Sequence, residues 1–342
     1  MPNNNKKNGP KTVNLVTGST SSLGVHLVKE LLKRGEVVRV IVQQHPSKND
    51  EWHTLPAGVA MYVADLTFPT DRDRKSLREA CKGVDRIFHL AAASFNYKFK
   101  YDEMININVI GTENMLKAYL DANPEPDARV HFIYSSSCTV YGYKRPGELL
   151  TEESEIKPAS PYSETKVMAE KVIQAFSASS KKIFYTIIRL GVFYGEGYER
   201  EVVKVFRLIK EGKITYIGSG SNHLTFVDVD DAVQAILLSL DNVRSVNNVY
   251  NITDGRPYTQ KSLFEMAAAS LKVKMPSRGI NPLVARIGAA TKSINYDEFE
   301  FLISDRSISI DKAKKELGYK PAKTVEDEAK RITKKLTEGP GA

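Results

Sequence analysis

Two residues that could move a proton, Tyr162 and Lys166, lie four positions apart in the run Tyr-Ser-Glu-Thr-Lys. The apolar pattern around them predicts a helix over residues 162–176, and side chains four apart on a helix share one face. A phenol with a pKa near 10 is a poor acid or base at neutral pH. A neighbouring ammonium would stabilise the phenolate and bring its pKa toward neutrality. Tyrosine and lysine also occur four apart by chance, so the pair needs supporting residues.

A run of hydroxyl side chains, Ser135 to Ser137, follows a strand predicted over residues 130–134. Doubly wound α/β folds bind ligands at the carboxyl ends of their strands, so we expect these hydroxyls to lie near Tyr162. A hydrolase nucleophile is a weaker interpretation of Ser137. No nucleophile-elbow glycines surround it, and none of the six histidines shows a pairing with it.

A glycine turn, Thr17 to Gly24, lies between the first predicted strand and the first predicted helix. Gly18 can take the tight turn, and Gly24 lets the helix approach the sheet. The helix N-terminus then offers N–H groups to a pyrophosphate. Ser21 stands where a third glycine is usual. Taken alone, the turn is equally well interpreted as an ordinary strand-to-helix connection capped by serines.

The end of the second predicted strand bears on the form of the dinucleotide. An acidic residue there would bind the ribose hydroxyls of NAD, whereas an arginine would bind the extra phosphate of NADP. Gln43 is neither, so both cofactors stay open. Asp65 follows the third predicted strand, where it could accept a hydrogen bond from the adenine amino group or serve as a turn residue.

Buried-strand patterns alternate with amphipathic helical patterns through the first half of the chain. Strands are predicted over residues 13–16, 37–42, 59–63, 86–90, 130–134 and 183–188, and helices over 23–33, 105–120 and 162–176. This alternation predicts a Rossmann-type doubly wound α/β fold, with a parallel sheet covered on both faces.

After residue 189 this alternation ends, and the pattern predicts helices over 202–209 and 228–240 and a strand over 249–252. We therefore expect a dinucleotide-binding domain over residues 11–190, to which 225–255 returns. A smaller α-rich substrate-binding lobe would comprise 191–224 and 256–336. Residues 1–10 and 337–342 are expected to be flexible tails.

The net charge of +8 is modest, and its densest clusters, 312–315 and 330–335, have acidic neighbours. No alternation of aromatic and basic residues accompanies them, so we expect no nucleic-acid partner. Cys81 and Cys138 match no metal-ligand or disulfide spacing, which predicts no metal site and a reducing compartment. Apolar stretches are far shorter than the roughly 20 residues of a membrane helix, and residues 1–11 lack the apolar core of a signal peptide. We expect a cytoplasmic protein with no integral membrane segment.

Taken in order, these segments resemble the extended short-chain dehydrogenase/reductases. That group contains sugar-nucleotide epimerases and dehydratases, hydroxysteroid dehydrogenases and dihydroflavonol reductases. The resemblance runs from about residue 13 to residue 328. It rests on segments 17–24, 65–66, 89–92, 108–112, 135–142, 162–166, 189–197 and 229–231.

The resemblance implies a role for each matching residue. Tyr162 would be the general acid/base, and Lys166 would tune it and contact the nicotinamide ribose. Ser137 would hydrogen-bond the substrate oxygen, and Asn108 would hold a helix irregularity and a proton-relay water. A small-molecule substrate and a homodimer are also implied. The residues expected to bind NAD or NADP are Gly18, Ser21, Ser22, Leu23, Gly24, Gln43, Asp65, Leu66, Leu90, Ala91, Ala92, Tyr162 and Lys166.

The segment 222–229 bears on the substrate class. In sugar-nucleotide enzymes of this group a similar segment places an arginine on the substrate diphosphate, but here that position is Leu224. This segment and residues 304–321 resemble instead the 3β-hydroxysteroid dehydrogenase-like branch. We therefore expect interconversion of a secondary alcohol and a ketone on an uncharged, apolar or cyclic substrate.

Two alternatives stay open. The first is a nucleotide-sugar epimerase or dehydratase with tightly bound NAD. The second is a non-catalytic dinucleotide sensor, which is disfavoured because both Tyr162 and Lys166 are present.

Residues 282–294 carry an apolar stripe that includes Leu283, Val284, Ile287 and Ile294. We interpret the segment as a helix packed in the core. A lid over a hydrophobic substrate and a contact with a membrane surface are the alternatives.

Overall fold

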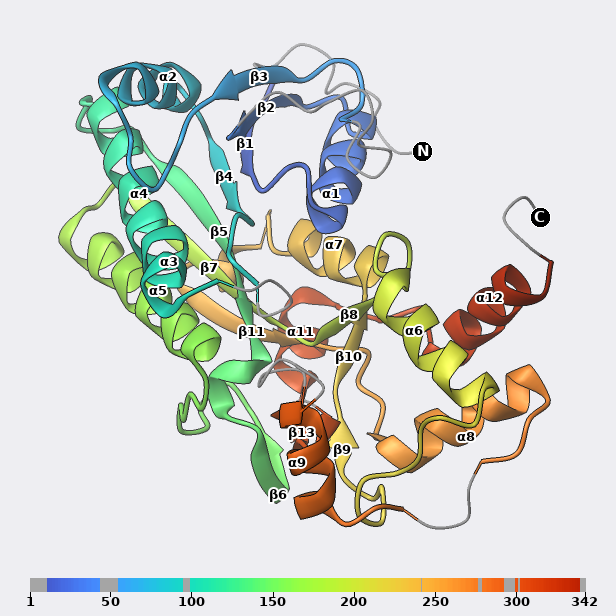
Figure 1. Ribbon diagram of the computed structural model, residues 1–342. Coiled ribbons are helices and arrows are strands. Elements are labelled where there is room, and N and C mark those ends of the chain that lie inside the picture. The colour runs from blue at the N-terminus through green and yellow to red at the C-terminus, as the bar shows by residue number, and fades with distance from the viewer. Residues whose placement is uncertain are drawn as a thin grey trace.

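The computed structural model describes residues 11–43, 55–94, 99–240, 242–275, 279–291, 299–300 and 302–338. Within these ranges a seven-stranded sheet crosses the molecule in the order β11–β7–β5–β4–β1–β2–β3, and all of its pairings are parallel (Figure 1). Its strands are β1 (Val13–Thr17), β2 (Val37–Val42), β3 (Ala60–Val63), β4 (Arg86–His89), β5 (Val130–Ser137), β7 (Ile183–Leu190) and β11 (Asn248–Ile252). The predicted doubly wound α/β fold is confirmed.

Helices cover both faces of this sheet (Figure 1). One face packs against α1 (Ser22–Lys33), α7 (Val229–Leu238) and α11 (Asp311–Leu317). The other packs against α2 (Asp71–Cys81), α4 (Gly111–Ala122) and α5 (Pro161–Ser179). Adjacent strand residues therefore enter opposite cores: Phe132 faces α4 and α5, whereas Ile133 faces α1 and α7. Burial on both sides explains why the central strands are apolar runs instead of alternating patterns.

Helix α2 was not predicted from the sequence. Most of its residues are charged, and its buried stripe consists of Leu77, Ala80 and Cys81 near its C-terminal end. Its N-terminus has a capping box formed by Thr70 and Asp73, a local signal that could have located it.

The single helix predicted over residues 105–120 has three parts. These are α3 (Tyr101–Ile105), a π-helical turn (Asn106–Ile110) and α4. The π turn is the helix irregularity that the family resemblance implied, and Asn108 lies within it. Such turns insert one extra residue into a helix and are frequent at functional sites.

The C-terminal half adds a helical cluster and small sheets. Helices α6 (Glu199–Lys210), α8 (Gln260–Leu271) and α12 (Val325–Glu338) lie together in the C-terminal half (Figure 1). Their apolar side chains form one core. The small sheets pair β8 (Val192–Tyr194) with β10 (Phe226–Asp228), β9 (His223–Leu224) with β12 (Tyr258–Thr259), and β6 (Lys144–Leu150) with β13 (Asp305–Ile308). These strands are mostly too short for a sequence period to reveal. The division into two domains stays a prediction.

The core-packed interpretation of residues 282–294 is wrong for the long apolar side chains of α9 (Pro282–Thr291). Leu283 is 68% exposed, and Val284 and Ile287 are each 61% exposed. Ala285 does pack, in a small cluster with Phe299. Ile294 lies outside the described residues. In the described part of the chain, no helix is both long enough and apolar enough to span a bilayer.

Candidate functional site

Three strands that carry predicted site residues at their carboxyl ends, β1, β4 and β5, lie next to one another in the sheet. Thr17, His89 and Tyr134 lie side by side in one row across these strands. The chain leaves that row at Gly18, at Leu90 and through Ser135–Ser137. Because parallel strands end at the same edge, segments separated by more than 100 residues in sequence form one surface.

The glycine turn has the geometry of a phosphate-binding turn. Gly18 has a φ of +65°, and a side chain there would bring its Cβ to 2.6 Å from the backbone nitrogen of Ala91. A Cβ on Gly24 would collide with the carbonyl oxygen of Gly18. Both positions therefore require glycine, the first for its conformation and both for close backbone approach.

The serines of this turn have separate tasks. Ser21 caps α1: its Oγ accepts from the Gly24 N–H at 3.1 Å and donates to the Gly18 carbonyl at 2.7 Å. The amides of Ser22 and Leu23 lie in the first helical turn, where no intrahelical acceptor exists, so they can bind an anion. The Ser22 hydroxyl donates to the Glu196 carbonyl at 2.6 Å, which ties the loop after β8 to the start of α1.

The residues expected to contact the adenosine half occupy the ends of β2 and β3. Gln43 is exposed just after β2. Asp65 shapes a turn, because its Oδ1 accepts from the Thr67 N–H at 2.7 Å and from the Thr67 hydroxyl at 2.5 Å. The carbonyl of Leu66 accepts from Asn114 Nδ2 at 2.7 Å. The contact of Asp65 with adenine stays a prediction.

His89 is the centre of a buried hydrogen-bond chain whose direction can be assigned. Burial lowers its pKa to about 3, so the ring is neutral. Thr112 Oγ1 donates to the Asn108 carbonyl at 2.6 Å, so it must accept from His89 Nε2, at 3.0 Å. His89 Nδ1 then accepts from Thr17 Oγ1 at 2.8 Å. Thr17 in turn accepts from the Ala91 N–H at 3.3 Å. The chain connects the π turn to the glycine turn.

Asn108 is fully buried and joins two segments of the site. Its Oδ1 accepts from the Ala93 N–H at 2.7 Å, and its Nδ2 donates to the Ala93 carbonyl at 3.1 Å. Nδ2 also donates to Thr165 Oγ1 at 2.9 Å, and Thr165 donates to the Tyr162 carbonyl at 2.8 Å. Asn108 thus holds the loop after β4 against the turn of α5 that carries Tyr162 and Lys166. A proton-relay water at Asn108 stays a prediction.

Helix α5 begins immediately before Tyr162 and Lys166, the pair predicted to transfer a proton. Ser160 caps it with Pro161 at the first helical position, so Tyr162 and Lys166 lie in its first two turns. Lys166 is 1% exposed. Its Nζ donates to the Ser135 carbonyl at 2.6 Å and lies 4.4 Å from the centroid of the Tyr134 ring. Burial lowers the pKa of Lys166 to about 7, against a smaller opposing effect of Glu170.

Ser137 is the last residue of β5 and caps the 3₁₀ turn Cys138–Tyr141. Its Oγ accepts from the Thr139 N–H at 3.2 Å and from the Thr139 hydroxyl at 3.0 Å. Because both of these bonds use Ser137 as the acceptor, its own proton can be donated to a ligand.

A buried ion pair behind the site was missed from the sequence. Arg189 on β7 donates to Glu170 on α5 through Nε at 3.1 Å and through Nη2 at 2.7 Å. Glu170 also accepts from the Ser136 hydroxyl at 2.5 Å, and Arg189 donates to the Tyr141 hydroxyl at 2.8 Å. Glu170 lies one helical turn beyond Lys166, and that spacing is the signal that could have drawn attention to it.

A second cation, Arg306 on β13, was also missed. It is 1% exposed, and its Nη1 donates to the Gly142 carbonyl at 2.7 Å. Its Nε has no partner, and none of the described carboxylates forms an ion pair with it. The adjacent Asp305 accepts from the His223 N–H at 2.9 Å, so Arg306 lies on the strand beside Leu224.

Two comparisons of amino-acid sequences and one of structures identify the group. The sequence profile described as the NAD dependent epimerase/dehydratase family matches residues 14–253. The chain belongs to this family. The prediction of an extended short-chain dehydrogenase/reductase enzyme is therefore confirmed, and its cofactor is of the NAD type.

Individual relatives are distant but span most of the chain. UDP-glucose 4-epimerase of Lactobacillus helveticus is 27% identical over 77% of this chain and 82% of its own length. Short-chain dehydrogenase/reductase family 42E member 1 of Danio rerio is 26% identical over 90% of this chain and 84% of its own length. The solved UDP-glucose 4-epimerase of Thermotoga maritima, with UDP-glucose, is 24% identical, covers 96% of this chain and 99% of its own, and superposes with a TM-score of 0.73.

The residues of the site fit a dinucleotide. Gly18 and Gly24 keep the turn free of side chains where the backbone must approach a pyrophosphate, and the first-turn amides of α1 supply its donors. Lys166 lies near the start of α5, and Ser137 is the last residue of β5. The assignment of each contact stays a prediction, as does the homodimer.

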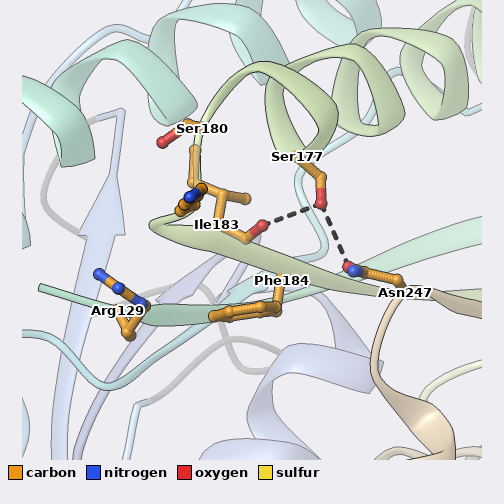
Figure 2. A pocket seen from close by; sticks show the side chains of 7 residues that line it. Arg129, Ser177, Ser180, Ile183, Phe184 and Asn247 are labelled. Carbon is orange, nitrogen blue, oxygen red and sulfur yellow. Dashed lines mark hydrogen bonds between the residues drawn. The ribbon is translucent and has the colours of Figure 1, made fainter. Parts of the chain in front are cut away.

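A recess on another surface does not belong to this site. Figure 2 shows it between the end of α5 and the start of β7, where Ser177 donates to the Ile183 carbonyl at 2.9 Å and to Asn247 Oδ1 at 3.1 Å. Ile183 is the first residue of β7, so the recess lies at the amino edge of the sheet, opposite the glycine turn.

Proposed function

We propose that this enzyme is an NAD-dependent nucleotide-sugar epimerase or dehydratase. The family match over residues 14–253 carries this proposal, and the UDP-glucose 4-epimerase relative supports it. The proposal replaces the expectation of an apolar or steroid-like substrate, which rested on the resemblance of two short segments.

Leu224 was the main argument against a diphosphate substrate, and Arg306 answers it. The buried Arg306 guanidinium donates to the Gly142 carbonyl and lies 5.2 Å from the centroid of the Tyr143 ring, but its Nε has no hydrogen-bond partner. A buried donor without an acceptor is costly, so an anionic oxygen bound at Nε would be stabilising. Arg306 lies on the strand beside Leu224, so it can supply the positive charge that position 224 lacks. We assign Arg306 to the diphosphate of the substrate.

The remaining chemistry is assigned to residues at the strand ends. Tyr162 would take the proton of a sugar hydroxyl and return it at the end of the cycle, with the Lys166 ammonium stabilising the phenolate between these events. Ser137 would donate its free proton to the reacting oxygen. The bound nicotinamide supplies a reversible hydride acceptor. Because acceptance and return occur in one cycle, no net NADH forms in an epimerase.

The test uses UDP-glucose with the NAD-loaded enzyme, and proton NMR follows the appearance of its C4 epimer. We expect epimer to form without net NADH absorbance, and we expect Tyr162→Phe to lose turnover while retaining bound NAD. Retained turnover in Tyr162→Phe would remove the assignment of the acid/base. Net NADH production from simple secondary alcohols, with no effect of UDP-sugars on the melting temperature, would return the protein to the alcohol dehydrogenase class.

The assignment of Arg306 has its own variant, Arg306→Met, with Arg256→Met as the control because Arg256 is exposed. A lost charge-assisted hydrogen bond is worth about 1.5–3 kcal/mol, or roughly 10- to 150-fold in KM for UDP-glucose. Melting temperatures of both variants show whether Arg306→Met still folds. A KM unchanged from that of Arg256→Met in a folded variant would contradict the assignment.

A further inference from the structure

The buried end of the Lys166 side chain raises a question that the proton-transfer scheme leaves open. The scheme needs an ammonium fixed in one place, yet the Nζ atom lies in a fully buried position where burial opposes its charge. None of the described carboxylates forms an ion pair with it. Something else must hold this cation where it is.

The contacts of Nζ identify two groups. The first is the Ser135 carbonyl, which accepts at 2.6 Å. The second is the ring of Tyr134, whose centroid lies 4.4 Å from Nζ. A ring face within about 6 Å attracts a cation, and the attraction reaches about 2 kcal/mol when the pair is desolvated. Both groups belong to adjacent residues of β5, so one strand end presents a carbonyl and a ring face to the same ammonium.

The Tyr134 ring is itself fixed from the side. The ring of His89, its neighbour in the sheet, stacks on it at 5.9 Å with an interplanar angle of 21°. His89 cannot rotate freely, because Thr17 and Thr112 bond both of its nitrogens. The position of the ring is therefore set by the same chain that holds the glycine turn and the π turn.

The hydroxyl of Tyr134 has no partner, although it is buried. A buried, unsatisfied hydroxyl costs about 1–3 kcal/mol, and burial raises the pKa of Tyr134 well above its usual value. A phenol in that state neither donates nor accepts a proton near neutral pH. The part of the residue that contacts a charge is the ring face.

We propose that Tyr134 is a positioning residue for the proposed proton transfer: its ring face holds the Lys166 ammonium, and its hydroxyl takes no part. This inference rests on the proposed roles of Tyr162 and Lys166. The other titratable groups that interact with Lys166 are His89 on β4, which is neutral, and Glu170 one turn along α5. Tyr162 on α5 lies close enough to Tyr134 to raise the pKa of that phenol. Glu170 acts at longer range and is already paired with Arg189.

The test separates ring from hydroxyl with Tyr134→Phe and Tyr134→Leu. Tyr119→Leu is the matched control, because Tyr119 is an equally buried tyrosine of the same apolar core, on α4. Lysine labelled with ¹³C at Cε reports the titration of Lys166 by NMR in the NAD-loaded protein, and the signal is assigned by its absence in Lys166→Arg.

We expect the Lys166 titration midpoint to fall by about one pH unit in Tyr134→Leu, since the lost attraction is about 1–2 kcal/mol and one unit corresponds to 1.36 kcal/mol. Tyr134→Phe and Tyr119→Leu should leave it unchanged. A midpoint in Tyr134→Leu equal to that of wild type would overturn the proposal. An equal shift in Tyr134→Phe would also overturn it, because the hydroxyl would then be responsible.

Turnover of UDP-glucose gives a second readout. In Tyr134→Leu the acidic limb of the kcat profile should move to higher pH, because a less charged Lys166 stabilises the Tyr162 phenolate less; KM should change little. The limb should not move in Tyr134→Phe. If Tyr162→Phe retains turnover while the Lys166 midpoint still falls in Tyr134→Leu, the proposed acid/base fails but the contact stands. If Tyr162→Phe is inactive and the midpoint does not move, only the role of Tyr134 fails.

Discussion

Lys166 and Arg189 are two buried cations within one region of the molecule, and they are held in opposite ways. Lys166 contacts a carbonyl and a ring face. Arg189 has two hydrogen bonds to the Glu170 carboxylate and a third to the Tyr141 hydroxyl. Burial opposes both charges. It lowers the pKa of Lys166 to about 7, whereas for Arg189 the hydrogen bonds and charge of Glu170 outweigh burial and raise the pKa.

The difference shows how one helix can serve chemistry and structure at adjacent turns. A bidentate carboxylate fixes the charge of its partner, which suits the attachment of α5 to the sheet. An ammonium without a carboxylate partner can respond to a neighbouring phenolate. The pair proposed to transfer a proton, Tyr162 and Lys166, therefore lies beside the Glu170–Arg189 ion pair but is not part of it.

Removal of the Lys166 amine is expected to have the largest effect on function. Lys166→Met should lower kcat for UDP-glucose by about 10²–10⁴-fold, the usual range for loss of acid–base assistance. Lys171→Met, at an exposed position of the same helix, should match wild type. Comparable kcat values for Lys166→Met and Lys171→Met would show that the Lys166 amine has no part in turnover.

Disruption of the Arg189 ion pair should lower the stability of the protein. Glu170→Gln leaves Arg189 charged, buried and without its carboxylate, which should cost about 3–5 kcal/mol of unfolding free energy by urea titration. The double variant Glu170→Gln/Arg189→Met removes the stranded charge and should recover most of that loss. A loss in the double variant equal to the sum of the two single losses would contradict the view that these residues act as a pair.

The sequence could predict the parts of the site that depend on local patterns, but not those that depend on contacts between distant segments. Tyr162, Lys166 and the glycine turn are local patterns, so their positions follow from helix spacing and from the strand-to-helix alternation. The ion pair between Glu170 and Arg189 joins two elements, α5 and β7, and its residues are 19 positions apart. The sequence around each residue does not indicate the other as its partner. Arg306 was missed for the same reason: its burial depends on β6 and β13 meeting, and short strands carry no detectable period.

The sequence was least informative about features that depend on which side chains are buried. The apolar stripe of α9 has a helical period, but the period cannot tell which face meets the core, and here the long side chains are exposed. The π turn interrupts an otherwise regular helix, and only the family resemblance had pointed to it. The argument from Leu224 considered one position only, because the sequence did not reveal that Arg306 is buried on the neighbouring strand.

The pH dependence of stability distinguishes the two cations directly. The pKa of Lys166 is near 10.5 when the chain is unfolded and about 7 when it is folded, so between these values the unfolded chain binds the extra proton. The unfolding free energy of wild type relative to Lys166→Met should then rise with pH from about 7 to 10.5, by at most about 1.4 kcal/mol per pH unit. Below pH 7 the difference in unfolding free energy should no longer change with pH, and wild type should be the less stable of the two proteins.

Thermal or urea unfolding of the NAD-free proteins, from pH 6 to 10, measures this difference. The unfolding free energy of Lys171→Met should run parallel to that of wild type throughout, because Lys171 is exposed and its removal leaves the buried amine of Lys166 in place. A flat difference between wild type and Lys166→Met over that range would mean that burial does not perturb the amine.

Among the residues that contact the two cations or their partners, Ser136, which donates to Glu170, is expected to give the smallest effect. Ser136→Ala removes the hydrogen bond to Glu170 Oε1, but both bonds from Arg189 remain, so the carboxylate is not left unpaired. The cost should therefore be near the low end for a bond to a charged group, about 1.5 kcal/mol. Ser177→Ala, which removes a partly exposed hydroxyl bonded only to neutral acceptors, the Ile183 carbonyl and Asn247 Oδ1, should cost less, about 0.5 kcal/mol. If the two alanine variants were equally destabilised, the charge of Glu170 would not be what strengthens the hydrogen bond from Ser136. The difference between Arg189, which a carboxylate holds, and Lys166, which a carbonyl and a ring hold, would then not be one of hydrogen-bond strength.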